Sequence, residues 1–312
     1  MDTEKKVVIA GAGTMGASLA QVYVQGGWKT VLYNRSAAGL ERAEELIALN
    51  QETLVREGLL TQAKSNDARR GIRMTTEKDC FADACLVVES IAEDLEVKGT
   101  FWAEISAIVP ETALLATNTS SLRVSAIAER VHLPERFMGQ HWLNPPHLLP
   151  LCEIVAGEKT SERNARQMRE WITALGKRPV MVKDIPGFII NRIQFAVLRE
   201  ALHIVETGSA TVEDVDTVLK AGMGVRYTAL GPFGIADFGG LDVFDRISGE
   251  LNKSLSNSKR QDPLLHELVK QGKWGVKSGA GFYDYSEERA EEAIRERDRL
   301  YIELAKVVLF PK

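Results

Sequence analysis

Residues 7–20 read VVIAGAGTMGASLA. An apolar run typical of a buried strand passes into a helical pattern, with glycines at the junction. Gly11 permits a tight turn, Gly13 lets a pyrophosphate approach the backbone, and Gly16 lets the helix pack against the strand. Because the motif follows a strand and opens a helix, it predicts a dinucleotide site. The predicted cofactor-binding residues of this loop are Gly11, Ala12, Gly13, Thr14, Met15 and Gly16.

The next strand, TVLYNRS at residues 30–36, bears on the choice of coenzyme. In NAD enzymes an acidic residue about 20 positions after the glycine motif binds the ribose 2′-hydroxyl. Here that place is taken by Asn34, Arg35 and Ser36. A guanidinium pairs well with a 2′-phosphate, and the two flanking side chains can donate hydrogen bonds. The residues therefore favour NADP, while NAD with Arg35 as a solvated loop residue stays the alternative.

Apolar runs alternate with helical patterns over the first 183 residues. The runs VVIA, LVVE and LLAT are nearly continuous, as in strands covered on both faces. This alternation predicts an α/β fold with a doubly wound parallel sheet of the Rossmann type. A long helical stretch from Ala38 to Arg70 should form a hairpin broken near Gly58. The expected strands are KKVVIAGAG (5–13), TVLYNRS (30–36), GIRMTT (71–76), DACLVVES (83–90), TALLATNTS (112–120), RFMGQHWLN (136–144), PLCEIVAG (150–157) and RPVMVK (178–183).

The pattern changes at KDIPGF, residues 183–188, after which helical patterns dominate. We therefore predict a dinucleotide-binding domain over residues 1–184 and an all-α C-terminal domain over residues 185–312. The helix expected at 187–206 is apolar over much of its circumference, which suits a buried core or a subunit interface. The charge-rich run at 286–308 is typical of a solvated face.

Composition excludes several classes of function. The chain is 45% hydrophobic and 26% charged, with a net charge of −4, so no basic excess indicates nucleic acid or an anionic membrane. No run approaches the roughly 18–20 apolar residues of a membrane span. The N-terminus resembles no signal peptide, and the three cysteines show neither metal-ligand spacing nor a disulfide framework. These features predict a reduced, cytoplasmic protein without a metal site.

One carboxylate stands out in the strand expected at 150–157. Alternation places Glu153 on the same face as Leu151 and Val155, and burying a carboxylate is costly unless a partner pairs with it. His141 ends the preceding apolar run and is a possible partner. From the residues alone, a core histidine and a solvated glutamate remain open.

Several motifs together resemble the L-3-hydroxyacyl-CoA dehydrogenase family over essentially the whole chain. They are the glycine loop, VVESIAEDLEVK, ATNTSSL, HWLNPPHLLPLCEIV, DIPGFIINRI, LGPFGIADFGGLD and GVKSGAGFYDY. The resemblance implies hydride transfer between a nicotinamide and a 3-hydroxy/3-keto pair, a place in fatty acid metabolism, and a helical C-terminal domain that usually forms a homodimer.

The resemblance also assigns site residues. His141 would act as acid and base with Glu153 behind it, while Ser120 and Asn191 would contact the substrate oxygen. Imidazole suits a proton shuttle near neutral pH. Ser120 could also cap a helix, with Ser121 as a rival. The cofactor contacts that the resemblance implies are Glu93, Lys98, Ser120, Asn144 and Lys277; for both lysines a plain surface position is the alternative.

Other residues depart from the acyl-CoA pattern. NPPHLLPLCEIV at 144–155 and GMGVRYTALGP at 222–232 look more like the L-gulonate 3-dehydrogenase and lambda-crystallin branch. Arg226 could pair with the carboxylate of a small hydroxy acid, or form a structural ion pair. The helical hairpin carries Arg56, Lys64, Arg69 and Arg70 but no clean match to a site for CoA phosphates. Three hypotheses follow: an acyl-CoA dehydrogenase acting on the 3-hydroxy group, a dehydrogenase of a free 3-hydroxy acid, and a dinucleotide-binding structural protein of crystallin type.

Overall fold

A computed structural model describes residues 5–309 of the chain. The described residues form two compact units, one ending at Asn191 and the other beginning at Arg192. The first is an α/β unit and the second is helical, which confirms the predicted fold class.

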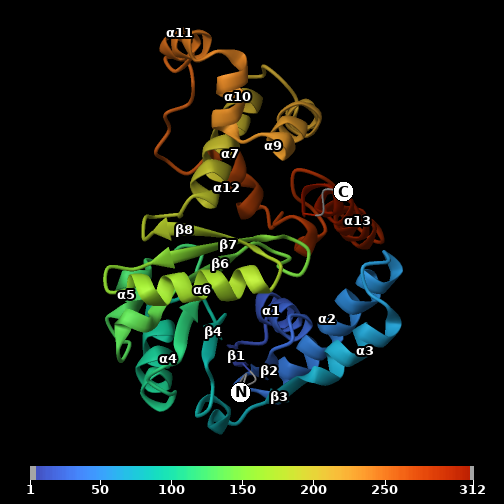
Figure 1. The fold of residues 1–312 in the computed structure, drawn as a ribbon. Coiled ribbons are helices and arrows are strands. Elements are labelled where there is room, and N and C mark those ends of the chain that lie inside the picture. The colour runs from blue at the N-terminus through green and yellow to red at the C-terminus, as the bar shows by residue number, and fades with distance from the viewer. Residues whose placement is uncertain (1–4, 310–312) are drawn as a thin grey trace. The chain divides into compact units, whose positions relative to one another are not determined.

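An eight-stranded sheet organises the first unit (Figure 1). In the strand order β3-β2-β1-β4-β5-β6-β7-β8, the chain adds strands first on one side of β1 and then on the other. The crevice at this switch point, beside β1, is where α/β folds bind dinucleotides. All eight segments expected as strands form strands. They are β1 (Lys6–Ala10), β2 (Lys29–Tyr33), β3 (Ile72–Thr75), β4 (Leu86–Glu89), β5 (Leu114–Thr117), β6 (Phe137–Trp142), β7 (Leu151–Ala156) and β8 (Arg178–Lys183).

Helices cover both faces of this sheet. Alternation along β1 sends Val7 and Ile9 into one apolar cluster with α1, α2 and α6, and Val8 and Ala10 into another with α4 and α5. The predicted hairpin breaks at Gly58, whose φ of 71° suits glycine. The helices of this unit are α1 (Thr14–Gln25), α2 (Ala37–Arg56), α3 (Gln62–Gly71), α4 (Leu95–Ile108), α5 (Val124–Ala128), α6 (Glu162–Ala174), and the 3₁₀ turns η1 (Lys78–Phe81) and η2 (Pro134–Arg136). The helix α7 (Ile190–Glu206) begins at the end of this unit.

The expectation of a purely parallel sheet is wrong for one pair. Strands β6 and β7 run antiparallel, and their register places His141 directly opposite Glu153. The physical reason lies in the connection, because residues 143–150 are too few for the crossover of a dozen or more residues that parallel strands need. The hairpin thereby brings the two side chains together.

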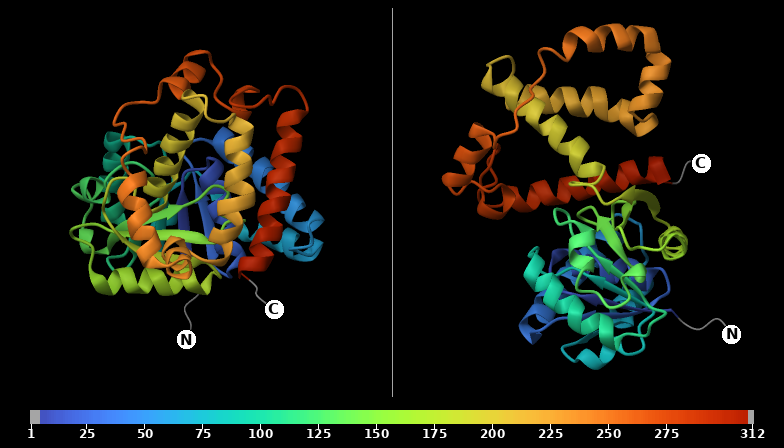
Figure 2. Two further views of the ribbon diagram at one scale, coloured as in Figure 1. Left: turned by 90° about the horizontal axis from the view of Figure 1, so that it is seen from above. Right: turned by 90° about the vertical axis from the view of Figure 1, so that its left-hand side faces the viewer.

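The second unit is built from helices joined by loops, and its run from α8 through η3 to α9 is continuous (Figure 2). Among its described residues only Leu202, Ile235 and Ile302 are buried. Large apolar side chains are exposed instead, including Phe233 at 86% and Phe238 at 84%. Besides α7, its elements are α8 (Val212–Val218), η3 (Leu219–Gly224), α9 (Val225–Ala229), α10 (Pro232–Gly239), α11 (Leu241–Leu251), α12 (Pro263–Lys270), η4 (Val276–Ser278) and α13 (Arg289–Leu309).

Two further observations concern residues 5–309 as a whole. No helix in this range combines the length and the apolar character that crossing a membrane requires. The three cysteines, Cys80, Cys85 and Cys152, are all free thiols.

Candidate functional site

The glycine loop leaves room only where a ligand would need it. A Cβ on Gly11 would lie 2.3 Å from the Ser90 carbonyl oxygen, and one on Gly16 would lie 1.8 Å from the Gly11 carbonyl oxygen. No atom lies within 4 Å of the corresponding point on Gly13, which is the N-cap of α1 and supplies no side-chain cap. Open space in front of an uncapped helix N-terminus suits a pyrophosphate.

A cavity of about 740 Å³ extends from this loop past the end of β2. Asn34, Arg35 and Tyr33 line it together with Gly11, Ala12 and Gly13. The Asn34 amide donates to the carbonyl oxygen of Ser36 (3.1 Å) and to its hydroxyl (3.2 Å), while that hydroxyl accepts from the Gly39 N–H at the start of α2. Arg35 is exposed. The side chains of Asn34 and Ser36 thus form hydrogen bonds within the turn, whereas the Arg35 side chain lines the cavity.

The predicted pair meets beneath a second cavity, of about 540 Å³. His141 Nδ1 lies 2.7 Å from Glu153 Oε2, and the two side chains are 3% and 2% exposed. Since a carboxylate only accepts, Nδ1 carries the proton and donates it to this bond. The neutral ring then keeps its lone pair on Nε2, which faces the Ser120 hydroxyl at 3.1 Å. The arrangement places a basic nitrogen at the cavity wall.

The other oxygen of Glu153 has a role that the sequence did not reveal. Glu153 Oε1 accepts from the backbone N–H groups of Ile189 (2.9 Å) and Ile190 (3.0 Å) at the start of α7. A carboxylate is favourable at a helix N-terminus, where the unpaired N–H groups point outward. These bonds anchor Glu153 and fix the position of the next residue, Asn191.

Asn191 closes a ring of contacts around the cavity. Its amide nitrogen donates to the Ser120 carbonyl oxygen at 3.1 Å, while the Ser120 hydroxyl faces His141. Ser120, His141 and Asn191 all line the 540 Å³ cavity. The predicted site residues on this wall are Gly13, Thr14, Met15, Glu93, Ser120, His141, Asn144 and Asn191.

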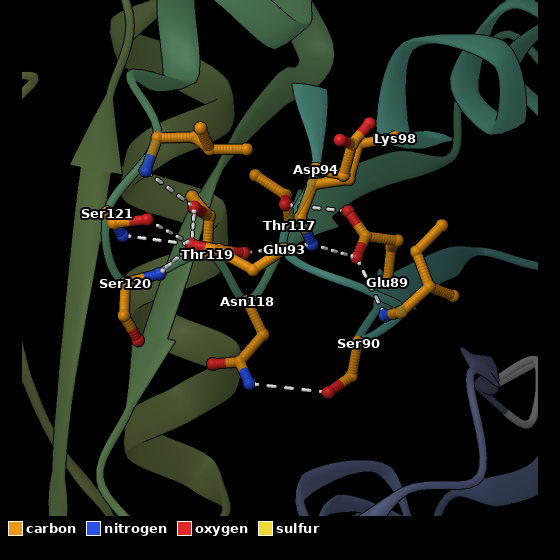
Figure 3. Close-up of polar contacts among 12 residues, drawn as sticks. Glu89, Ser90, Glu93, Asp94, Lys98, Thr117, Asn118, Thr119, Ser120 and Ser121 are labelled. Carbon is orange, nitrogen blue, oxygen red and sulfur yellow. Dashed lines mark hydrogen bonds and ion pairs between the residues drawn. The ribbon is translucent and has the colours of Figure 1, made fainter. Parts of the chain in front are cut away.

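The predicted cofactor residues Glu93 and Lys98 sit differently from each other (Figure 3). Glu93 reaches the cavity wall, whereas the Lys98 side chain is fully buried and its ammonium faces Glu89 and Glu93. Burial raises the pKa of Glu93, but bonds from Thr119 and Ser121 and the Lys98 charge outweigh it and hold that pKa at about 2. The surface alternative for Lys98 is therefore wrong.

Asn144 stands on the loop that joins β6 to β7, after Trp142 and before a cis peptide bond to Pro145. The Lys177 ammonium holds this loop by donating to the carbonyl oxygens of Pro146 (2.6 Å) and Leu149 (3.1 Å). Burial lowers the pKa of Lys177 to about 8.

Sequence reasoning missed two side chains beside the pair. The Phe188 ring packs on the His141 ring with centroids 5.3 Å apart, and its φ of 49° is unusual for a bulky residue. Asn118 Oδ1 accepts from the Trp142 N–H at 3.1 Å and lines the cavity. The Pro-Gly-Phe turn was the available signal for Phe188, and for Asn118 it was the motif ATNTSSL at residues 116–122.

Arg226 and Lys277 belong to the second unit. Arg226 is exposed on α9. Lys277 Nζ lies 5.5 Å from the centroid of the Trp274 ring, a cation–π contact. Their roles toward substrate and cofactor stay predictions.

Both units match a known protein family in sequence. Residues 6–185 match the family model described as 3-hydroxyacyl-CoA dehydrogenase, NAD binding domain, and residues 187–285 match the C-terminal domain of the same family. A probable 3-hydroxybutyryl-CoA dehydrogenase of Deinococcus radiodurans is 38% identical over 281 residues, which cover 90% of this chain and all of that one.

A second relative matches more of the chain. The 5-formyl-3-hydroxy-2-methylpyridine 4-carboxylate 5-dehydrogenase of Mesorhizobium japonicum is 32% identical over 97% of this chain and 98% of its own length. A crystal structure of a dehydrogenase of that name, described as NAD+ dependent, superposes with a TM-score of 0.92 at 32% identity and covers 99% of this chain and all of its own. The (S)-3-hydroxybutyryl-CoA dehydrogenase of Ralstonia eutropha reaches 0.75 at 31% identity, covering 91% and 100%. The chain belongs to the 3-hydroxyacyl-CoA dehydrogenase family.

Proposed function

We propose that this chain transfers a hydride reversibly between a nicotinamide coenzyme and the 3-hydroxy/3-keto carbon of a small substrate. The bond from His141 Nδ1 to Glu153 Oε2 supports this proposal most directly, because it leaves on Nε2 a lone pair that can accept a proton at the cavity wall, 3.1 Å from the Ser120 hydroxyl. A bound nicotinamide would supply the hydride acceptor or donor. Gly13 and the start of α1 would hold the pyrophosphate of the coenzyme, because open space lies in front of Gly13, while Gly11 would allow the close turn beside Ser90.

His141 would take the proton of the substrate hydroxyl on Nε2 during oxidation and return it during reduction. Glu153 would stabilise the imidazolium that forms, since the carboxylate accepts from Nδ1 at 2.7 Å. Positioned acid–base catalysis of this kind contributes about 10²–10⁴-fold. The Ser120 hydroxyl and the second N–H of the Asn191 amide would donate to the substrate oxygen and stabilise its alkoxide character.

For the coenzyme we propose NADP ahead of NAD. Arg35 is exposed at the cavity while its neighbours Asn34 and Ser36 shape the turn, so a 2′-phosphate would meet a guanidinium. The family model and the pyridine carboxylate dehydrogenase, both described with NAD, support the alternative.

Two substrate classes have support. The family and its 3-hydroxybutyryl-CoA dehydrogenases favour a short-chain 3-hydroxyacyl-CoA. The pyridine carboxylate dehydrogenase favours a small free acid, because that protein matches almost the whole chain. The C-terminal family model, in contrast, ends at residue 285, before α13 begins. With a free acid as substrate, the Arg226 guanidinium would form an ion pair with the substrate carboxylate.

We also propose a homodimer formed through the second unit. Its described residues bury three side chains, and Phe233 and Phe238 on α10 stand almost fully in solvent. Apolar surface on this scale indicates a partner surface, and a second copy of the chain would cover it.

The proposal is tested by initial rates of NADPH and of NADH oxidation with acetoacetyl-CoA and with free acetoacetate. Fast turnover of acetoacetyl-CoA alone assigns the acyl-CoA class, and turnover of the free acid alone assigns the other. If protein that binds a dinucleotide turns over no 3-keto or 3-hydroxy compound, the proposal fails and the crystallin-type hypothesis takes its place.

A further inference from the structure

Glu93 builds the turn that carries Ser120. Its Oε1 accepts from the backbone N–H groups of Ser120 and Ser121, each at 2.9 Å. The same oxygen accepts from the hydroxyls of Thr119 (2.5 Å) and Ser121 (3.0 Å). Figure 3 shows these contacts converging on one carboxylate from one side of the turn. Four donors on a single oxygen leave that atom no capacity for a ligand.

Lys98 lies on the other side of the same carboxylate. Its ammonium is 3.4 Å from Glu93 Oε2 and pairs with Glu89 Oε1, and its side chain is 0% exposed. The Glu89 carboxylate also accepts hydrogen bonds from the Thr117 hydroxyl (2.7 Å), the Trp102 indole N–H (3.2 Å) and the Ile91 backbone N–H (2.9 Å). A buried ammonium is tolerated only where acceptors surround it, so the two glutamates and Lys98 form one interdependent group.

This group of Glu89, Glu93 and Lys98 is connected through Ser120 to His141. Ser120 receives its backbone position from Glu93, and its hydroxyl lies 3.1 Å from His141 Nε2. We propose that Glu93 is a positioning residue that sets Ser120 against His141, with Lys98 as its buried counter-ion. This inference rests on the proposed function, because it concerns the same site.

The competing role is direct contact with the cofactor, which the family resemblance implies for both residues. The two roles change different measurements. Loss of a cofactor contact weakens dinucleotide binding, whereas loss of a positioning residue lowers kcat at unchanged dinucleotide affinity. A displacement of about 1 Å at a reacting group costs on the order of 10²-fold in rate.

The test compares Glu93→Ala and Glu93→Gln with Asp94→Ala. Asp94 caps α4 by accepting from the Val97 N–H at 2.9 Å, so its loss loosens the same helix start without touching the Ser120 turn. We expect Glu93→Ala to lower kcat about 10- to 100-fold while the dinucleotide Kd changes less than about threefold. Glu93→Gln keeps an acceptor oxygen, so its kcat should fall between those of Glu93→Ala and wild type. Asp94→Ala should keep the wild-type kcat.

A rise of tenfold or more in the dinucleotide Kd with unchanged kcat in Glu93→Gln would overturn the inference. A readout that needs no substrate separates it from the proposed function. The ¹⁵N resonance of His141 Nε2, assigned with His141→Gln, should move in both Glu93 variants and stay in Asp94→Ala. An unmoved resonance contradicts the positioning role even if the wild type proves inactive on every substrate, whereas inactivity with a moved resonance contradicts only the proposed function.

Discussion

The first unit buries all five residues of β1, four of them in two apolar clusters, whereas the second unit buries three side chains among its described residues. Both belong to the same family, yet only the first contains a sheet whose two faces are covered within the chain. Burial of apolar surface is the main favourable term in folding. The first unit therefore holds its site within a core of its own, while the exposed apolar side chains of the second unit are those that the proposed homodimer would cover.

The largest expected effect concerns the His141–Glu153 pair of the first unit. Replacing Glu153 by Gln removes the charge behind His141 and leaves an amide that can turn its N–H₂ toward Nδ1. We expect kcat to fall about 10²–10⁴-fold with little change in dinucleotide affinity. Stopped-flow measurement of coenzyme oxidation checks this, with the exposed Glu158→Gln as control. Equal rates for both variants would remove the pair from the mechanism.

The second prediction addresses the exposed face of the second unit. The double substitution Phe233→Glu and Phe238→Glu places charges on the surface that a second copy would cover. We expect the protein to become monomeric in sedimentation velocity and to lose thermal stability. Leu49→Glu, at an apolar position of the first unit that is 59% exposed, should change neither. A wild-type protein that is already monomeric would contradict the homodimer.

A smaller effect is expected at the coenzyme cavity. Arg35→Ala removes the guanidinium that we assign to the 2′-phosphate, so NADPH binding should weaken about tenfold, the scale of one charge-assisted hydrogen bond, while NADH binding stays nearly constant. Titration of fluorescence quenching measures both. Arg42→Ala, an exposed arginine on α2, serves as control. Equal weakening for the two coenzymes would show that Arg35 does not read the phosphate.

The smallest expected effect concerns acid stability of the first unit. The pKa of Glu93 is lowered from 4.5 to about 2, so its stabilising contribution is complete above pH 4.5 and is lost as the pH falls toward 2. The melting temperature of wild type should therefore drop more between pH 5 and pH 3 than that of Glu93→Gln, as calorimetry would record. Parallel curves for the two proteins would contradict this account of Glu93.

Local patterns predicted much of the first unit. The apolar runs indicated all eight strands. The residues alone left His141 only a possible partner for Glu153, and the family resemblance singled out the pair that the structure brings together. The antiparallel pair was missed although the short connection after Trp142 demanded it. The bonds from Glu153 to Ile189 and Ile190 depend on how a distant helix start meets β7, which no local pattern encodes. Burial of Lys98 was likewise not indicated, because its acceptors Glu89 and Glu93 surround it only through the way the chain turns from β4 into α4.

Proton transfer by His141 can be tested by single-turnover oxidation of bound NADPH and NADH by a 3-keto substrate, in wild type, in His141→Gln and in the exposed-histidine control His132→Gln. We expect a fall of about 10²–10⁴-fold in His141→Gln alone, with dinucleotide binding retained in all three proteins. Transfer at the wild-type rate in His141→Gln would show that this histidine moves no proton in the reaction, and the assignment of the His141–Glu153 pair would be withdrawn.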